Sequence, residues 1–247
     1  MITKPYYLSY ESRYQKAYEA GMEIWGHTSA DETLSSMLAK WVDDNGLKGK
    51  RVIDFACGEG AGGEILSRLG CIYHGVDISP AAIDKAKILL KDYPNASVYL
   101  HDMVEESVSE KYDAAIDIMG LHMLVLDDHR AKYLNNAFNC LKNNAPMLFF
   151  RELHNENATE ERIETFEQWQ TVMGEDYTTP KLKTVSHNGT KVEVNMTYLP
   201  ARNKSKSGYI RELTQAGFIV EDFMIMEMNM QNPYSASIFV RKPIALV

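Results

Sequence analysis

The chain has 247 residues, 45% of them hydrophobic and 24% charged, which is typical of a globular protein with one large domain. The formal net charge of −8 argues against binding to nucleic acid or to anionic membranes, because both attract basic proteins. The three cysteines are widely spaced and form no C-x-x-C pair, so we expect neither a disulfide framework nor a metal site. Free thiols and the lack of an 18-residue apolar run indicate a cytoplasmic protein that spans no membrane.

Residues 1–47 are predicted to form helices rich in aromatic side chains. Four tyrosines recur at spacings of three and four, which places them on one face of a helix: Tyr7, Tyr10, Tyr14 and Tyr18. Two interpretations of this stripe stay open. The rings either pack into the core or form a lid over a bound ligand, in which case Tyr14 and Trp25 are candidates to close over it.

Residues 51–63 read R-V-I-D-F-A-C-G-E-G-A-G-G, an apolar run that contains one acid and ends in four glycines within six residues. This pattern predicts a buried strand that enters a tight turn and then a helix. Such a turn directs backbone N–H groups at one point, and glycine lets a ligand approach closely. We therefore expect a small polar ligand at this turn.

Strands and helices alternate after this turn. Strands are predicted at residues 52–55, 71–76, 98–100, 114–118 and 147–150, with helices between them, which favours a parallel, doubly wound sheet with helices on both faces. Residues 207–217 are predicted to form a further helix, followed by two closing strands within 218–230 and 236–240. Four helices are expected to begin after a Ser or Thr cap: Ser29, Ser79, Thr159 and Ser207.

Residues 152–206 interrupt the alternation. They contain a predicted helix and two alternating runs, residues 182–186 and 192–198, joined through Asn188-Gly189, a strong hairpin signal. We interpret this segment as a cap inserted over the sheet that decides the substrate. It has no basic stripe, so a small-molecule substrate is favoured over nucleic acid.

Acids lie at or near the carboxyl ends of the first three predicted strands: Asp54, Asp77 and Asp102. Ligands of open parallel sheets bind beyond the carboxyl ends of the strands, where an acid after the second strand can accept hydrogen bonds from a ribose diol. The pattern Gly58-x-Gly60-x-x-Gly63 matches the dinucleotide fingerprint, which would make the protein an NAD(P)-dependent oxidoreductase. However, a carboxylate at Asp54, in the mouth of the site, favours a cationic ligand over a pyrophosphate.

Several segments resemble motifs of the class I S-adenosylmethionine-dependent methyltransferases: residues 52–60, 75–79, 101–103, 112–118 and 216–218. The resemblance covers residues 50–150 and 207–240. With the strand pattern, it implies a doubly wound, mostly parallel seven-stranded sheet with an antiparallel closing strand. We expect a single domain, divided into a helical lid (1–47), a cofactor-binding core (48–151), the helix-plus-hairpin cap (152–206) and a closing helix and strands (207–247).

At the methionine end of S-adenosylmethionine, the resemblance implies that Gly58 and Gly60 turn the backbone around the cofactor. Asp54 would lie near its ammonium group and Asp117 near the amino acid or the methyl group. Ala56 stands where the family has a glycine, and its methyl group would narrow this end of the site.

At the nucleoside end, the resemblance implies that Asp77 holds the ribose hydroxyls and that Ile78 packs against the adenine. Asp102 would accept a hydrogen bond from the adenine amino group, with Met103 beside the ring.

On the acceptor side, His122 is the first candidate for a general base, because it follows the fourth strand. An equal alternative is that His122 stands at a helix start and only bonds the backbone there. Arg151 either binds a substrate carboxylate or forms a surface ion pair. We expect methyl transfer to a small molecule. The alternatives are the oxidoreductase above and a catalytically silent protein that binds the cofactor. Nothing in the sequence indicates an oligomeric state.

Overall fold

The first strand in the chain is β1 (Arg51–Phe55), whose last four residues are buried, as expected for a parallel strand covered on both faces. In a computed structural model, residues 5–177, 179–187, 190–227 and 234–244 are described. Within them, β1 belongs to a seven-stranded sheet of order β3-β2-β1-β4-β5-β9-β8. The other six strands are β2 (Ile72–Asp77), β3 (Ala96–Leu100), β4 (Ala114–Ile118), β5 (Pro146–Leu153), β8 (Ile219–Glu227) and β9 (Tyr234–Arg241).

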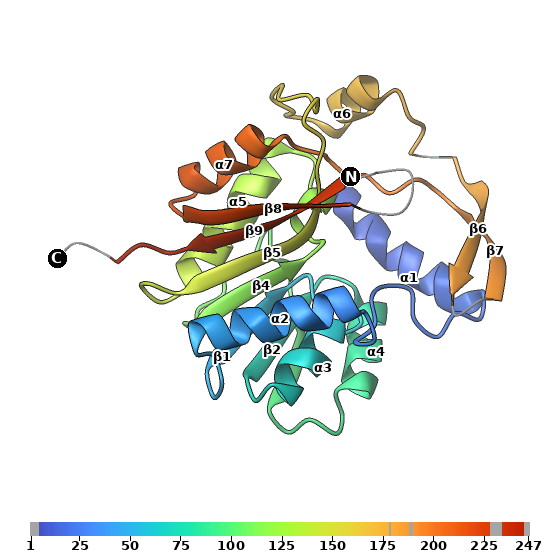
Figure 1. Ribbon diagram of the computed structural model, residues 1–247. Helices are drawn as coiled ribbons and strands as arrows, with labels where there is room; N and C mark the ends of the chain where they lie inside the picture. Colours follow the sequence, from blue (N-terminus) through green and yellow to red (C-terminus); the bar gives the residue numbers. More distant parts are fainter. Residues whose placement is uncertain (1–4, 178, 188–189, 228–233, 245–247) are drawn as a thin grey trace.

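The directions of these strands confirm the predicted fold class. Strands β1 to β5 run parallel, whereas β9 lies between β5 and β8 and is antiparallel to both. The last strand in the chain, β9, therefore lies inside the sheet, and β8, which precedes it in the chain, forms the edge (Figure 1).

Helices cover both faces of the sheet because alternate strand residues point to opposite sides. Val52 packs in a core with α2 (Glu32–Asn45), α3 (Ala61–Arg68) and α4 (Pro80–Leu89). Ile53 and Phe55 pack in the other core, with α5 (Asp127–Cys140) and α7 (Lys206–Gln215). None of the described helices is long and apolar enough to cross a membrane.

The N-terminal residues and the insertion lie together beside the sheet. We call residues 5–31 the lid segment; it contains η1 (Tyr6–Leu8) and α1 (Ser9–Glu19). The predicted hairpin is confirmed as β6 (Lys181–His187) and β7 (Thr190–Met196), with residues 188–189 of its turn outside the described residues, and β7 contacts α1 (Figure 1). The insertion also carries α6 (Phe166–Met173), and η2 (Leu121–Met123) follows β4.

One of the four predicted N-caps is confirmed and three are wrong. Ser79 accepts from the Ala82 N–H as predicted. The other caps are Asp31, Thr165 and Ser205 in place of Ser29, Thr159 and Ser207. Each of these three caps has an extended backbone and directly precedes the first helical residue, which places its side-chain oxygen near the free N–H groups.

Candidate functional site

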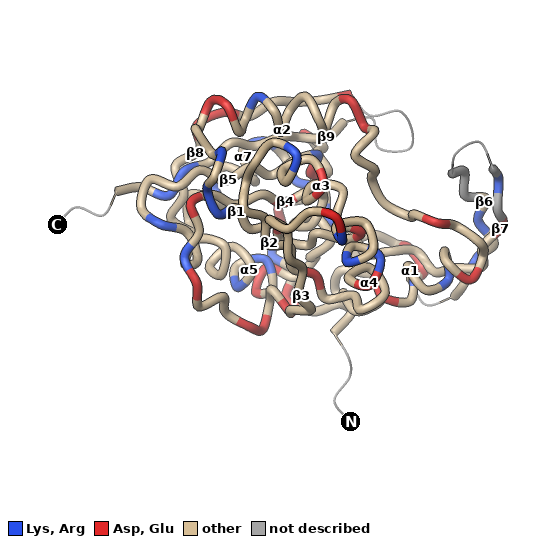
Figure 2. The backbone as a smooth tube through the Cα atoms, turned by 90° about the horizontal axis from the view of Figure 1, so that it is seen from below, with Lys and Arg blue, Asp and Glu red and all other residues tan. Residues whose placement is uncertain are grey.

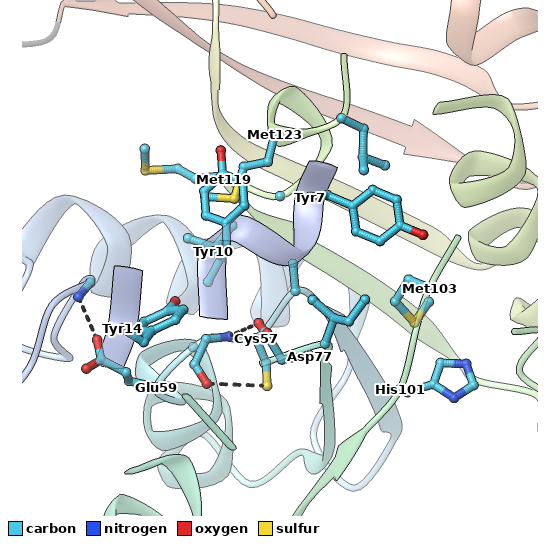
Figure 3. Close-up of a pocket in the computed structure, with 18 of the residues that line it drawn as sticks. Tyr7, Tyr10, Tyr14, Cys57, Glu59, Asp77, His101, Met103, Met119 and Met123 are labelled. Carbon is cyan, nitrogen blue, oxygen red and sulfur yellow. Dashed lines mark hydrogen bonds between the residues drawn. The ribbon is translucent and has the colours of Figure 1, made fainter. Parts of the chain in front are cut away.

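A cavity of about 380 Å³ lies at the carboxyl ends of β1 to β4, where ligands bind in open parallel sheets. Its walls come from the turn after β1, the ends of β2, β3 and β4, and the lid segment (Figure 3). Among the described residues, none of 152–206 lines it. The insertion, which we predicted to cap the sheet and to decide the substrate, therefore contributes no described residue to the wall of this cavity.

The insertion instead holds the lid segment in place. Tyr10 donates a hydrogen bond from its hydroxyl to the carbonyl of Pro200 at 2.7 Å, and Arg13 donates to the carbonyl of Thr197 at 3.4 Å. Tyr7 is buried in the core, as one interpretation of the tyrosine stripe predicted, and it also lines the cavity together with Tyr10 and Tyr14.

The turn after β1 brings its backbone close to the lid. Gly58 and Gly60 have φ angles of +52° and +89°, which glycine adopts readily. A Cβ on Gly58 would lie 2.9 Å from the hydroxyl of Tyr14, which points from α1 toward this turn (Figure 3). Only glycine leaves room here between the turn and the ring.

Ala56 lines the cavity in a strained conformation. Its φ of +57° lies in the left-handed region that a non-glycine residue seldom adopts, at a cost of about 1 kcal/mol or more. The family's glycine would take this conformation freely. Its methyl group forms part of the cavity wall, where we predicted that it narrows the site.

Asp77 lies at the cavity wall and connects β2 to the glycine turn. Its Oδ2 accepts from the Gly58 N–H and its Oδ1 from the Ser79 N–H, both at 2.8 Å. Burial raises the pKa of Asp77 above its usual range, although these two N–H donors favour the charged form. Each oxygen keeps a lone pair that can accept a further hydrogen bond.

The residues predicted around the nucleoside end also line the cavity, namely Ile78, Asp102 and Met103. Asp102 accepts from the Val104 N–H at 2.9 Å and from the Tyr7 hydroxyl at 3.1 Å. The loop after β3 is therefore bonded to the lid segment at this end of the cavity.

Asp54 does not lie at the mouth of the cavity, so this prediction is wrong. It is fully buried on the face of β1 that packs under α3, its Oδ2 accepts from the Tyr73 hydroxyl at 2.8 Å, and its Oδ1 has no partner. Burial raises the pKa of Asp54 to about 8. Its side chain therefore does not present a negative charge to a ligand.

Asp117 and His122 are also placed behind the wall. Asp117 is fully buried and accepts from the Gly120 N–H at 2.6 Å and the Tyr133 hydroxyl at 2.8 Å, so it supports two residues that do line the cavity. His122 is 3% exposed, and its Nδ1 lies 3.0 Å from Glu152 Oε2. The structure does not place His122 where a base would meet a ligand.

The lid candidates separate into two groups. Tyr14 and Trp25 line the cavity. Arg151 does not; its guanidinium pairs with Asp31 in the lid segment, with Nη2 3.2 Å from Oδ1. Arg151 thus forms an ion pair, which was one of its two predicted roles, and this pair is partly buried.

Glu59 is a site residue that sequence reasoning missed. It is 5% exposed, and its carboxylate accepts from the N–H groups of Trp25 (2.9 Å) and Gly26 (2.6 Å) and from the hydroxyl of Tyr18 (2.7 Å). It therefore connects the lid segment to the glycine turn. The position of Glu59 between two motif glycines indicates that it lies near the ligand site. Its hydrogen-bond partners, however, lie more than 30 residues away in the sequence, so their contact could not be predicted.

His27 was missed as well. It lines the cavity, and its Nε2 lies 2.7 Å from Met119 Sδ. The break in the tyrosine pattern at Trp25-Gly26-His27 is the available signal, because a loop that crosses a ligand site often carries its polar groups.

Comparisons with known proteins agree with the motifs. Residues 52–144 match a family model described as a methyltransferase domain. Over 100 residues the chain is 32% identical to the ubiquinone biosynthesis O-methyltransferase of Aromatoleum aromaticum, a match that covers 39% of this chain and 43% of the relative. The chain thus matches less than half of the length of this curated relative.

Two solved structures show the same fold over nearly the whole chain. The 1,6-didemethyltoxoflavin-N1-methyltransferase of Burkholderia thailandensis has a TM-score of 0.63 at 14% identity, covering 98% of this chain and 92% of that one. The cyclase SpnF has a TM-score of 0.69 at 11% identity, covering 98% of both chains. Residues 52–144 thus resemble a methyltransferase domain, and the two solved structures share the fold of nearly the whole chain.

Proposed function

We propose that the protein is an enzyme that transfers a methyl group from S-adenosylmethionine to a small molecule. The observation that carries this proposal is the cavity at the carboxyl ends of β1 to β4, formed by the family's own motif segments and closed by aromatic side chains of the lid segment. The O-methyltransferase relatives favour an oxygen atom as the acceptor.

The residues of the cavity fit this cofactor. Asp77 would accept from the ribose hydroxyls, Ile78 and Met103 would pack against the base, and Asp102 would accept from its amino group. Gly58 and Tyr14 both line the cavity, and the methionine portion would lie beside them. Because Asp54 does not line the cavity, the rings of Tyr10, Tyr14 and Trp25 would stabilise the positive charge through cation–π contacts.

The bound cofactor supplies an activated methyl group on its sulfonium sulfur. The protein aligns donor and acceptor and excludes water, and alignment alone can be worth about 7–11 kcal/mol. The lid segment would perform both tasks, because it forms one wall of the cavity and is bonded to the glycine turn through Glu59.

The two alternatives find no support. The dinucleotide-binding sheet has six strands in the order 3-2-1-4-5-6, whereas here the antiparallel strand β9 lies between β5 and β8 in a seven-stranded sheet, and the family match is to a methyltransferase domain. A catalytically silent protein would show the same fold, so a turnover measurement is needed to test that alternative.

A small-molecule substrate fits the charge distribution as well as the cavity. Lys and Arg alternate with Asp and Glu along the chain without a basic stripe (Figure 2), so we propose neither nucleic acid nor membrane as a partner. All three cysteines, Cys57, Cys71 and Cys140, are unpaired and buried, which supports a cytoplasmic location. We retain the proposed domain organisation, with residues 152–206 as a support for the lid.

The test is a screen of small-molecule acceptors in which release of S-adenosylhomocysteine is measured. The proposal predicts release that requires both the protein and an acceptor. Binding of S-adenosylhomocysteine without release for any acceptor would favour the silent protein, and binding of NADH without binding of S-adenosylhomocysteine would favour the oxidoreductase.

A further inference from the structure

His27 faces the cavity on one side and a fixed carboxylate on the other. It lies between α1 and α2, and 30% of its side chain is exposed. Its Nε2 is directed at the sulfur of Met119 at 2.7 Å, on the wall formed by residues 118–120. A thioether sulfur is only a weak hydrogen-bond partner, so Nε2 has no strong partner in the protein.

The carboxylate behind the ring is Asp31, whose Oδ2 lies 3.6 Å from His27 Nδ1. The guanidinium of Arg151 and the N–H of Leu34, at 3.0 Å from Oδ1, hold Asp31 in place. Partial burial raises the pKa of Asp31, but the hydrogen bonds from Arg151 and Leu34 outweigh this and hold it below the usual range. Asp31 is therefore ionised and only accepts hydrogen bonds.

The neighbours of the ring favour one tautomer of the neutral imidazole. Since Asp31 only accepts, a proton on Nδ1 suits the carboxylate, and the lone pair of Nε2 then faces Met119 Sδ at the cavity wall, where the flexible methionine side chain has to yield to an acceptor. Burial lowers the pKa of His27, the charge of Arg151 and the nearby His122 lower it further, and Asp31 opposes them. His27 is thus an uncharged base at neutral pH.

We propose that His27 is the general base of the methyl transfer and that the acceptor is a hydroxyl group on an aromatic ring. This inference rests on the function proposed above. As the new O–CH₃ bond forms, the S–CH₃ bond of the sulfonium breaks and its electron pair stays on sulfur, which becomes neutral. The hydroxyl proton moves to His27 Nε2, and the resulting imidazolium is stabilised by Asp31 until the exposed part of the ring returns the proton to water.

The class of acceptor follows from the aromatic residues that line the cavity and from the match between the pKa of the acceptor hydroxyl and that of the His27 base. Tyr10 and Trp25 of the lid segment line the cavity as His27 does, and their aromatic rings favour a flat acceptor. A ring hydroxyl has a pKa of about 10, as in tyrosine, which is within a few units of an imidazole base. An aliphatic hydroxyl is a far weaker acid and is less well matched to this base.

The other histidine in the cavity wall is less suited to this role. His101 has Nδ1 at 3.0 Å from Glu106 Oε2 and Nε2 at 3.2 Å from the Glu106 carbonyl, so both of its ring nitrogens have partners. His122 lies behind the wall, paired with Glu152.

The first test compares His27→Gln with the wild type on a panel of phenols, catechols and nitrophenols. We expect kcat to fall by about 10²–10⁴-fold for phenol while the Kd for S-adenosylhomocysteine changes less than twofold. The loss should be much smaller for a nitrophenol that is already ionised at the assay pH. His74→Gln is the control, because His74 lies outside the cavity and bonds the Tyr112 hydroxyl, and it should keep the wild-type kcat.

A second variant, Asp31→Asn, tests the positioning residue and keeps a residue that can cap α2. Removing the charge should lower the pKa of His27, so the acid limb of the kcat profile should move to lower pH. A purely structural role would lower kcat without moving this limb. Circular dichroism of both variants confirms that they fold.

The outcomes separate this inference from the proposed function. Wild-type kcat in His27→Gln, or methylation of amines or aliphatic alcohols but of no ring hydroxyl, would overturn the role of His27 or the acceptor class while methyl transfer stands. Failure of the wild type to bind S-adenosylhomocysteine would overturn the proposed function and this inference with it.

Discussion

The bond between the lid segment and the glycine turn depends on one carboxylate, and Glu59→Ala removes it. The variant leaves the N–H groups of Trp25 and Gly26 and the hydroxyl of Tyr18 without their acceptor. A hydrogen bond to a charged group contributes about 1.5–3 kcal/mol, but the freed groups can be hydrated once the lid segment opens. We therefore expect a loss of about 3 kcal/mol that is confined to this segment.

Hydrogen exchange measures this loss directly. Since about 1.4 kcal/mol corresponds to a factor of ten, amides of residues 18–27 should exchange about 100-fold faster in Glu59→Ala, while those of β1 and β4 keep their protection. Glu19→Ala is the matched control, because Glu19 is exposed at the end of α1 and its loss changes the charge equally. Unchanged protection of residues 18–27 in Glu59→Ala would refute the reasoning.

Three further predictions concern the cavity and the acids behind it. Asp77→Ala should weaken binding of S-adenosylhomocysteine by about 1.5–3 kcal/mol in calorimetric titration without unfolding the protein, and unchanged affinity would remove the ribose assignment. Ala56→Gly should leave the free energy of unfolding within about 1 kcal/mol of the wild type, because relief of the left-handed strain offsets the added chain entropy; denaturant titration checks this, and a larger loss would contradict the strain. Burial raises the pKa of Asp54 to about 8, above its unfolded value of about 4. Between these two pH values the folded state binds more protons than the unfolded state. The free energy of unfolding should therefore fall as the pH rises through this window. Asp54→Asn should reduce this fall, which denaturant titrations of both proteins at pH 5 and pH 8 would measure. If the variant showed the same pH dependence as the wild type, Asp54 would not be the protonated group.

The sheet was predictable from the sequence because buried parallel strands are continuous apolar runs between glycines and helices. The predicted strand at residues 114–118 has the bounds of β4, and those of β1 and β2 differ by one residue. Asp77 and Asp102 were placed at the cavity correctly, since both stand at or just after the end of a strand.

The errors at Asp54 and Asp117 come from side-chain direction. Both stand inside a strand, so each side chain points to a face of the sheet that helices cover, and motif spacing does not reveal that it points there and not into the cavity at the strand end. Spacing also places His122 near the end of β4 without showing that it pairs with Glu152 of β5.

Glu59 and His27 were missed for a different reason. Their roles depend on the lid segment packing against the sheet, which brings together residues that are tens of positions apart. Local periodicity contains no information about such contacts, and it indicated only that the tyrosine stripe has one common face.

The central claim is that the cavity at the carboxyl ends of β1 to β4 binds a sulfur nucleoside. Calorimetric titration of the wild type with S-adenosylhomocysteine and, separately, with NADH tests it most directly. We predict one binding site for S-adenosylhomocysteine, weakened in Asp77→Ala, and no heat from NADH. Binding of NADH, with no response to S-adenosylhomocysteine, would contradict the account.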